Sequence, residues 1–547
     1  MNRIGIGLLL VLFGSAFNPL VRAADVLTYH NDLARTGLNP NETILTPQNV
    51  ASGSFGLLRT LPVDGQLYAQ PLYVSNLAVT SGGQAQGSRN VVIVATEHDS
   101  IYAFDADSGT LYWKTSLLGG GETPSDDLDC DDLTPEIGIT ATPVIDRAAG
   151  SNGLIYALAM SKDAGGAYHQ RLQALDLATG QVVRSVEIQA SYPGTFGPDN
   201  DGQGHVVFVP QHERSRAALL LANGNLYLEW ASYCDHAPYS GWIIAYNENT
   251  FAQTAVFNTN PSGLPTSSWL PDGSGGGIWQ SGAAPAVDAA GNLYVGVGNG
   301  PFDINLDANG FPTNRDFGDA LLKLSPGLQV LDYFTPFNQL SLASQDLDAS
   351  AGGSMVLDIA DSRGVVHNLA LTAGKDASLY VVDRNNFGKY NAASNNIYQQ
   401  LPGTRPGAFS APASFNGFFY LSLAAHAIQQ LQFTANATLN PVPVSVTPEV
   451  FGWPGASPTI SSSGNAQGIV WAIERGTTQA ILHAYDAANL ATELYTSAAV
   501  NLGTPIKFAV PTVCNGKVFV GTYDSVAVFG LAPPANLVDL DGDGRSD

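Results

Sequence analysis

The chain has 547 residues, of which 45% are hydrophobic and 13% are charged, with 58 glycines and 32 prolines. This composition excludes disorder of the whole chain and suits many short buried strands joined by turns. The formal net charge of −24, from 47 acidic and 23 basic residues, would repel phosphate backbones and anionic lipid. It argues against nucleic acid as a partner, and its simplest role is solubility.

The first 23 residues have the pattern of a secretory signal. Arg3 precedes an apolar run over residues 4–17, and Val21-Arg22-Ala23 ends the segment in a small-x-small pattern. The run is too short for a stable transmembrane helix, although a retained anchor is the alternative. No later segment reaches about 18 uninterrupted apolar residues. We therefore expect a soluble mature chain, secreted or periplasmic, without membrane contact after signal removal.

Residues 103–113, with the sequence AFDADSGTLYW, form the clearest local pattern. Apolar runs before and after the Asp-x-Asp-Ser-Gly turn signal predict strand, tight turn and strand. Ala suits two closely packed sheets, Asp bonds the turn backbone, Gly allows a positive φ and Trp covers the neighbour. The phrase returns at residues 174–180 and, more loosely, at 245–247, 322–327, 382–385 and 484–487. Repeats at roughly 40 to 70 residues indicate a β-propeller.

Eight segments have the pattern of the first strand of a propeller blade. They lie at residues 70–74, 142–146, 217–221, 284–288, 353–357, 411–414, 457–460 and 510–513. We therefore predict an all-β fold, one eight-bladed β-propeller of four-stranded antiparallel blades over residues 24–531. The last blade runs out of chain after residues 525–529. The spare run at residues 55–63 could supply its missing strand and so remove an open sheet edge.

The three cysteines, Cys130, Cys234 and Cys514, allow one disulfide in an oxidising compartment. Cys514 lies in a strand-like apolar run, where a buried inert thiol is the ordinary case. Cys130 and Cys234 both lie in polar loop segments. We therefore predict that these two are bonded.

The sequence changes character after residue 531, where residues 532–535 read as a short stiff linker. Carboxylates then alternate around a glycine at Asp539, Asp541, Asp543 and Asp547, the pattern of a calcium loop. The chain stops before the glutamate that an EF-hand would need. The tail resembles the start of a dockerin-type or FG-GAP-type calcium repeat, and a frayed acidic end is the alternative.

The repeated phrase Ala-x-Asp-x-x-Ser/Thr-Gly-x-x-x-Trp resembles that of the pyrroloquinoline quinone (PQQ) repeat proteins over roughly residues 55–531. The best-known members are quinoprotein alcohol and methanol dehydrogenases with eight-bladed propellers. The resemblance implies PQQ on the propeller axis, between a tryptophan and a disulfide of adjacent cysteines. It also implies calcium or a lanthanide held by Glu, Asn and Asp, with an Asp as base toward the alcohol. No Cys-x-x-Cys-His is present, which removes the haem-bearing members.

The resemblance assigns roles to five residues of this chain. Trp279, in GGGIW, would be the stacking tryptophan and Asn299, in GVGNGP, a metal ligand. Lys375 would contact the cofactor's oxygens, while Asp346 and Asp348 fall at the segment of the catalytic base. The structural alternatives are a buried core tryptophan, a turn asparagine and a solvated turn lysine.

Two departures from the family pattern concern the metal and the stacking faces. His236 stands where the family has its metal-binding glutamate, and imidazole suits calcium poorly, although Asp235 beside it could substitute. The adjacent cysteine pair is reduced to Cys130, in the acidic run of residues 126–132, so the quinone would lose one stacking face. That run could line a mouth for a cation or be a solvated loop.

These departures favour a secreted propeller with an eroded or rebuilt quinone pocket that serves as a binding or scaffold module. The alternative is a PQQ- and calcium-dependent dehydrogenase that oxidises an alcohol or sugar, since the fold alone does not decide the activity. The broad face and axial funnel of a propeller could bind a small molecule, a glycan or a protein. We expect a monomer.

Overall fold

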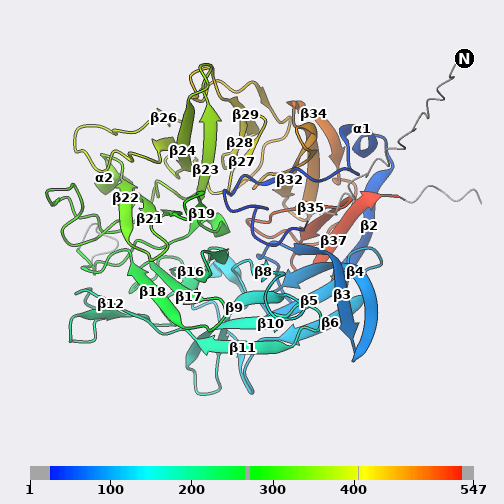
Figure 1. Ribbon diagram of the computed structural model, residues 1–547, viewed down its shortest axis with the longest axis horizontal. Helices are drawn as coiled ribbons and strands as arrows, with labels where there is room; N and C mark the ends of the chain where they lie inside the picture. Colours follow the sequence, from blue (N-terminus) through cyan, green and yellow to red (C-terminus); the bar gives the residue numbers. More distant parts are fainter. Residues whose placement is uncertain (1–24, 265–271, 404–405, 533–547) are drawn as a thin grey trace, which may run out of the picture.

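The computed structural model describes residues 25–264, 272–403 and 406–532. Strands make up almost all of its regular structure, with two short α-helices, α1 (Pro47–Val50) and α2 (Gln339–Ala343), in the part described. Eight four-stranded antiparallel sheets stand in a ring around a central axis (Figure 1). The prediction of an all-β, eight-bladed propeller is confirmed.

Blades are numbered by the chain order of their first, innermost strands. Blade 1 contains β3 (Leu72–Ser81), β4 (Gln84–Ala95), β5 (Ser100–Asp105) and β6 (Leu111–Ser116). Blade 2 contains β8 (Val144–Asp146), β9 (Leu154–Lys162), β10 (Tyr168–Asp176) and β11 (Val182–Glu187), and β7 (Thr123–Pro124) also pairs with β9. Blade 3 contains β15 (Leu220–Ala222), β16 (Asn225–Ala231), β17 (Trp242–Asn247) and β18 (Gln253–Asn258), with β14 (Arg214–Ser215) added on β16. Blade 4 contains β19 (Ala286–Val287), β20 (Leu293–Gly296), β21 (Leu321–Leu324) and β22 (Val330–Phe334).

The second half of the ring follows the same order. Blade 5 contains β23 (Ser354–Ala360), β24 (Val366–Ala373), β25 (Leu379–Asp383) and β26 (Gln399–Leu401). Blade 6 contains β27 (Ala413–Phe415), β28 (Phe418–Ser422), β29 (Ile428–Gln432) and β30 (Ser445–Val446). Blade 7 contains β31 (Thr459–Ser463), β32 (Ala466–Arg475), β33 (Ala480–Asp486) and β34 (Asn489–Thr496), with β1 (Leu38–Asn39) parallel to β31. Blade 8 contains β35 (Thr512–Cys514), β36 (Lys517–Gly521), β37 (Ser525–Leu531) and β2 (Phe55–Pro62). A separate hairpin pairs β12 (Ser191–Pro193) with β13 (His205–Val207). Each predicted first-strand segment overlaps the first strand of one blade.

Blade 8 is closed by the early strand β2, which pairs antiparallel with β37. The register matches Phe55 with Leu531 and Pro62 with Ser525, and β2 lies beside the red β37 in Figure 1. The ring of Phe55 also stacks on that of Phe529, with centroids 6.2 Å apart. The predicted closure is therefore confirmed, and it removes the edge that an open ring would expose.

The repeated turn phrase joins neighbouring blades. In blade 1, Asp105 Oδ1 accepts hydrogen bonds from the backbone N–H groups of Asp107 (2.8 Å) and Ser108 (2.7 Å), as an Asx turn requires. Gly180, in the same turn of blade 2, has a φ of +73°, and a Cβ there would lie 2.4 Å from the Trp113 ring of blade 1. Glycine is therefore needed both for the turn and for the approach of the neighbouring tryptophan.

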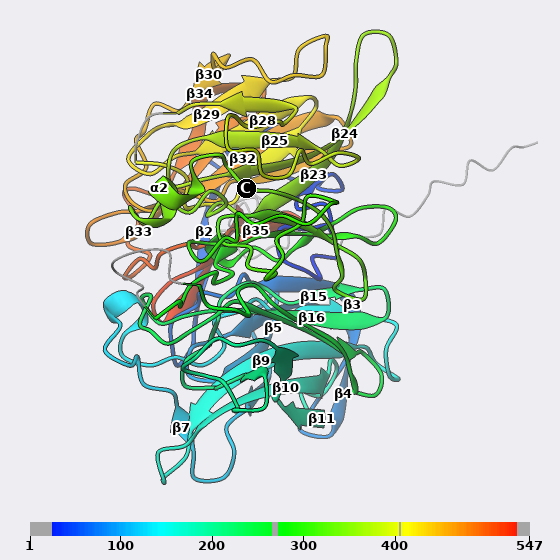
Figure 2. The same cartoon turned by 90° about the vertical axis from the view of Figure 1, so that its left-hand side faces the viewer.

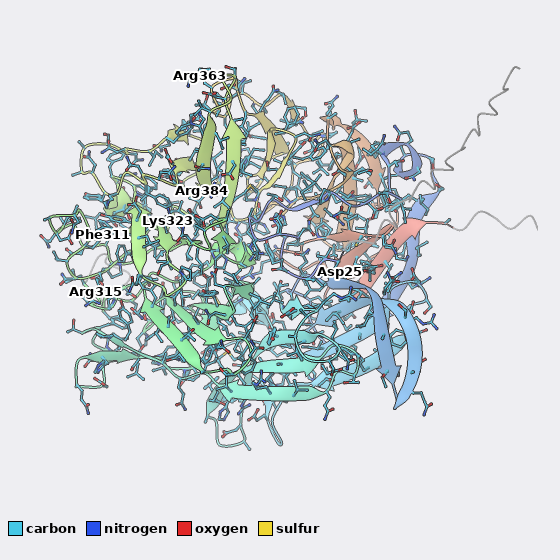
Figure 3. The ribbon with its side chains drawn as sticks, in the orientation of Figure 1. Asp25, Phe311, Arg315, Lys323, Arg363 and Arg384 are labelled. Atoms are coloured by element: carbon cyan, nitrogen blue, oxygen red, sulfur yellow. A yellow bond between two sulfur atoms is a disulfide. The ribbon has the colours of Figure 1, made fainter. Side chains whose placement is uncertain are left out.

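Other side chains connect blades further out. Lys323 of blade 4 donates to the carbonyl oxygen of Arg384, which follows blade 5's β25, at 2.7 Å, and both side chains are labelled in Figure 3. Seen from the side, β9, β10 and β11 of blade 2 lie opposite β28, β29 and β34 of blades 6 and 7 (Figure 2). No helix in the described ranges is long and apolar enough to cross a membrane.

Residues 26–37, which we call the N-terminal plug, cross the middle of the ring (Figure 1). The sequence did not predict this segment's role. Its carbonyls accept backbone hydrogen bonds from the inner strands of five blades: Ile145 to Leu27 (2.9 Å), Val287 to Leu33 (2.7 Å), Val356 to Ala34 (3.1 Å), Ser414 to Thr36 (2.9 Å) and Ile460 to Gly37 (2.7 Å). Val26 pairs with Tyr73 of blade 1. The plug therefore ties six blades together at the axis.

Candidate functional site

A cavity of about 380 Å³ lies on the propeller axis. Most of its lining residues come from loop segments just before the start of the innermost strands. The plug instead bonds residues within those strands. The cavity and the plug therefore occupy different ends of the axis. The lining residues are Tyr68, Asp132, Leu133, Arg214, Arg216, Cys234, Asp235, Trp279, Ser281, Asp346, Asp348, Ala351, Lys375, Phe409, Trp453, Lys507 and Phe508.

The cavity wall brings together the predicted residues Asp346, Asp348 and Lys375, and the buried Asn299 bonds to both aspartates. Lys375 Nζ lies 2.6 Å from Asp346 Oδ1 and 2.9 Å from Asp348 Oδ2. Asn299 donates through Nδ2 to Asp346 Oδ1 at 2.6 Å, and through its backbone N–H to Asp348 Oδ1 at 2.7 Å. Burial alone would lower the pKa of Lys375, but the two carboxylates outweigh it and raise that pKa. Burial also raises the pKa of Asp346.

Asn299 leaves one oxygen available beside these carboxylates. The residue is 3% exposed, and its buried Oδ1 has no hydrogen-bond partner among the described residues. A buried amide oxygen without a partner is costly, so a ligand at this position would stabilise the site. Amide and carboxylate oxygens are the ligands that calcium prefers.

Asp235 and His236 differ in where they lie. Asp235 lines the cavity and accepts a hydrogen bond from the Tyr239 hydroxyl at 2.7 Å. Burial raises the pKa of Asp235 to about 6, and the negative charge of Asp348 acts in the same direction. His236 is exposed and does not line the cavity. Of the two candidates for the place of the family's glutamate, Asp235 is the one that lines the cavity together with Asp346 and Asp348.

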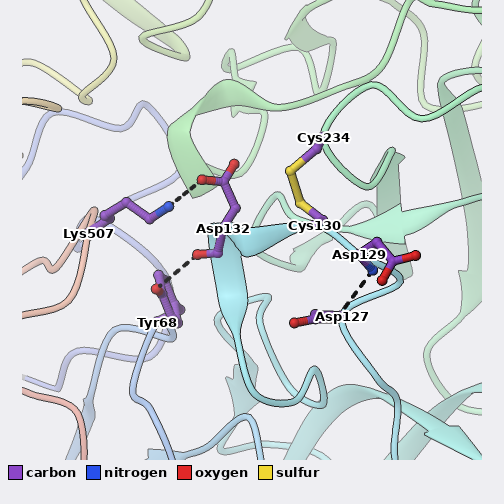
Figure 4. Close-up of a disulfide and its surroundings, with 7 residues drawn as sticks. All are labelled: Tyr68, Asp127, Asp129, Cys130, Asp132, Cys234 and Lys507. Atoms are coloured by element: carbon purple, nitrogen blue, oxygen red, sulfur yellow. Dashed lines mark hydrogen bonds and ion pairs between the residues drawn. A yellow bond between two sulfur atoms is a disulfide. The ribbon is translucent and has the colours of Figure 1, made fainter.

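The predicted disulfide between Cys130 and Cys234 is present (Figure 4). It joins residues 104 positions apart, from the loop before blade 2 and the loop between β16 and β17. Cys234 lines the cavity, so a disulfide lies at the wall although the cysteines are not adjacent in sequence. This corrects the expectation that only a lone cysteine would be left there. Cys514 is the buried free cysteine.

Trp279 also lines the cavity, as expected for a stacking tryptophan. A Cβ on Gly277 or on Gly298 would lie 3.0 Å from its indole ring. The Gly298 N–H donates to the Gly277 carbonyl at 2.9 Å, and these two adjacent glycines let one edge of the indole pack tightly against the backbone. Such packing fixes the plane of the ring.

Sequence reasoning missed two arginines in the cavity wall, Arg214 and Arg216. They are 3% and 5% exposed, and neither forms a salt bridge within the described part of the chain. Arg214 Nε and Arg216 Nη2 are buried without hydrogen-bond partners. The guanidinium of Arg216 lies over the Phe508 ring, 4.7 Å from its centroid. The sequence signal that could have indicated them is the Arg-x-Arg spacing shortly before β15, the innermost strand of blade 3.

The nearby carboxyl groups of Glu97 and Asp132 interact electrostatically with these arginines, but in the described part of the chain neither forms an ion pair with them. Burial lowers the pKa of Arg216 to about 10, and the positive charge of Arg214 acts the same way. Glu97 faces both arginines, but burial raises its pKa to about 7. Buried cations without a counter-ion are costly. The cavity is therefore suited to an anionic ligand.

The remaining predicted metal residues, Asp539, Asp541, Asp543 and Asp547, lie outside the described residues, as does the predicted signal over residues 1–23.

No protein-family model and no curated protein matches the chain. Solved structures do resemble it. The quinohemoprotein alcohol dehydrogenase from Comamonas testosteroni aligns with a TM-score of 0.59 and 17% identity, over 93% of this chain and 81% of that one. The quinohemoprotein alcohol dehydrogenase ADHIIG from Pseudomonas putida HK5 gives 0.59 and 16% over the same shares. A europium-containing methanol dehydrogenase gives 0.57 and 13%, over 93% and 98%. At these identities the likeness shows a shared propeller fold.

Proposed function

We propose that this protein is a PQQ- and calcium-dependent dehydrogenase that oxidises an alcohol or sugar outside the cytoplasm. The observation that carries the proposal is the pair of buried arginines that form no ion pair within the described residues, in a cavity that also holds a tryptophan and a disulfide. The disulfide is consistent with an oxidising compartment. The structural neighbours named as alcohol and methanol dehydrogenases support the same class.

The lining fits a flat quinone that carries carboxylates. Trp279 and the Cys130–Cys234 disulfide would supply flat apolar faces for the ring system. Arg214 and Arg216 would bind carboxylates through charge-assisted hydrogen bonds, which satisfies donors that otherwise have no partner. The chemistry of the donors therefore matches the chemistry of the cofactor.

The acidic side of the cavity fits calcium. Asn299 would contribute its unpartnered Oδ1, with carboxylate oxygens from Asp348 and Asp235. Lys375 already holds Asp348 in place through its Nζ and its backbone N–H, which donates to the Asp348 carbonyl at 2.8 Å. Asp235 would take the place of the family's glutamate, and His236 has no part in this ligand set.

Asp346 is the residue best placed to accept the proton of an alcohol. Lys375 and the Asn299 amide both contact its Oδ1, so its Oδ2 is left for a hydroxyl. Its raised pKa favours proton uptake. When bound, the quinone would supply the oxidant, taking up the hydrogen of the alcohol's C–H bond with its electron pair while the base holds the O–H proton. Lys375 and Asn299 act as positioning residues that fix the orientation of the base.

The rival hypothesis, a scaffold with an eroded pocket, needs none of these contacts. A titration with PQQ and calcium separates the two. We expect the purified protein to gain the quinone's absorbance and to reduce an artificial electron acceptor in the presence of an alcohol. Absence of PQQ binding at micromolar concentration would leave the scaffold hypothesis alone.

A variant pair tests whether the axial cavity is the site. Asn299→Ala removes the available oxygen and one of the two donors to Asp346, so calcium-dependent dye reduction should be lost. Asn249→Ala changes an exposed turn residue of blade 3 and should keep wild-type activity. Equal activity of the two variants would place the chemistry elsewhere.

A further inference from the structure

Three aromatic side chains line the cavity on the side of blades 6 to 8. They are Phe409, Trp453 and Phe508, which precede β27, β31 and β35, and we call them the aromatic wall. The ring centroids of Phe409 and Trp453 are 6.0 Å apart at 67°, and those of Trp453 and Phe508 are 6.1 Å apart at 75°. Trp453 is 42% exposed, so the wall reaches from the cavity to the surface.

A cationic side chain lies within about 6 Å of every ring of the aromatic wall. Lys507 Nζ lies 5.3 Å from the Trp453 ring, and the Arg475 guanidinium lies 6.0 Å from the same ring. Arg216 covers Phe508, and Lys375 Nζ lies 6.0 Å from Phe409. Of these four cations, Lys375 and Lys507 are paired with aspartates of the cavity, whereas Arg216 and Arg475 form no ion pair within the described residues. An anion carried by an apolar or aromatic body would contact both the rings and these cations.

Lys507 is a cation of the cavity lining that is not used by the proposed cofactor site. It is 9% exposed, and its single ion partner in the described ranges is Asp132, whose side chain is 52% exposed (Figure 4). Burial lowers the pKa of Lys507, and Arg214 and Arg475 act in the same direction. An incoming carboxylate could therefore replace or join the exposed Asp132 and stabilise the ammonium.

The two halves of the cavity have complementary chemistry. Asp235, Asp346 and Asp348 belong to blades 3 to 5, where the base and the metal ligands are proposed. The aromatic wall and Lys507 belong to blades 6 to 8. A substrate that spans the cavity would place its hydroxyl at the acidic half and its body on the aromatic wall.

We infer that the substrate is an alcohol whose aromatic or apolar body carries a carboxylate, and that Lys507 binds this carboxylate in the cavity. The inference rests on the proposed dehydrogenase function and narrows its substrate class. In this scheme Lys507 determines substrate specificity by binding the substrate's carboxylate, and Arg214 and Arg216 bind the carboxylates of the cofactor.

The test compares 4-(hydroxymethyl)benzoate with the neutral 4-methylbenzyl alcohol, using the full chain with PQQ, calcium and an artificial electron acceptor. The wild type should prefer the carboxylate about tenfold in kcat/KM, the ratio that corresponds to about 1.4 kcal/mol. Lys507→Met should bring the ratio of the two alcohols close to one. Asp132→Asn removes the competing carboxylate and should raise the ratio. Lys517→Met is the matched control, because this blade 8 lysine also pairs with an aspartate, Asp107, but does not line the cavity.

A binding measurement keeps the two hypotheses apart. Titration of the cofactor-free protein with 4-(hydroxymethyl)benzoate should quench the fluorescence of Trp453, and this signal should be weakened by Lys507→Met and absent from Trp453→Phe. Lys507-dependent binding without turnover of any alcohol would support a carboxylate-binding site at Lys507 and refute the dehydrogenase. Turnover of both alcohols at equal rates, unchanged by Lys507→Met, would refute the substrate class while the dehydrogenase stands. Neither binding nor turnover would refute both.

Discussion

The two ends of the propeller axis both contain buried arginines, but they use them differently. At the plug, Arg35 is 1% exposed, and its guanidinium donates to the carbonyls of Pro285 (2.9 Å), Tyr29 (2.8 Å) and Asp32 (2.9 Å). At the cavity, Arg214 and Arg216 are almost as deeply buried, yet they bond no carbonyl or carboxylate among the described residues. The plug arginine stabilises the fold through these bonds, whereas the cavity arginines have no such partners and are proposed to bind a ligand.

This contrast follows from what each end must do. The plug satisfies the backbone of six inner strands and so replaces the water that an open axial channel would hold. The cavity keeps polar groups unpaired, which costs folding free energy that a bound ligand can recover. Buried side chains without partners also occur at the plug, where Arg35 Nη2 has none. What distinguishes the cavity is that the side chains of its arginines bond no carbonyl among the described residues, whereas that of Arg35 bonds three.

The largest expected effect is on stability at the plug. Arg35→Met removes the donor to three carbonyls and should lower the free energy of unfolding by about 3–5 kcal/mol. Arg216→Met replaces an unpaired buried charge with an apolar chain and should leave the stability of the cofactor-free protein unchanged or slightly higher. Urea unfolding measures both.

Arg363→Met serves as the surface control for these variants. Arg363 pairs with Asp361 at 2.6 Å, but its side chain is 77% exposed (Figure 3), so its loss should change stability by less than about 1 kcal/mol. If Arg35→Met and Arg216→Met destabilised the protein equally, the distinction between the two ends would be wrong.

The fold was predictable because its signals are local and repeated. Each blade carries its own strand and turn pattern, and the incomplete last blade together with the spare run at 55–63 was enough to predict closure by β2. The plug was not predictable, because residues 26–37 have no periodic pattern and bond strands that are distant in sequence. Its role is visible only when six blades are placed around it.

The candidate site was predicted in part. Family-like motifs indicated Trp279, Asn299 and Lys375, and all three lie at or beside the cavity. The loop positions of Cys130 and Cys234 were enough to pair them, but not to place their disulfide at the cavity wall. Arg214 and Arg216 were missed because an arginine's role depends on its counter-ions, which sequence spacing does not give.

A smaller effect is expected from the carboxyl group that faces the cavity arginines. Burial raises the pKa of Glu97 from 4.5 to about 7. Hydrogen bonds from the Gly138 N–H and the Thr140 hydroxyl lower this pKa, but burial has the larger effect. The folded state therefore holds this proton more tightly than the unfolded chain. Its contribution to stability is present below pH 4.5 and is lost as the pH rises to about 7, by up to about 3 kcal/mol.

Glu97→Gln should remove this pH dependence. Urea unfolding between pH 4.5 and pH 8 measures it, and the difference between wild type and variant isolates Glu97 from Asp99, Glu213 and Glu229, whose pKa values burial also raises. Identical pH slopes for the two proteins would mean that Glu97 is ionised in the fold and neutralises the arginines.

The smallest expected effect concerns ligand affinity at the cavity arginines. Each guanidinium should contribute one charge-assisted contact to a carboxylate of the quinone, so Arg216→Met should weaken PQQ binding about tenfold, or about 1.4 kcal/mol. Arg216→Lys keeps the charge but loses the planar fork that also stacks on Phe508, and it should recover only part of the affinity. Absorbance titration with PQQ measures both constants. Unchanged affinity in Arg216→Met would show that the unpaired arginine serves another ligand, and the contrast with Arg35 would then rest on stability alone.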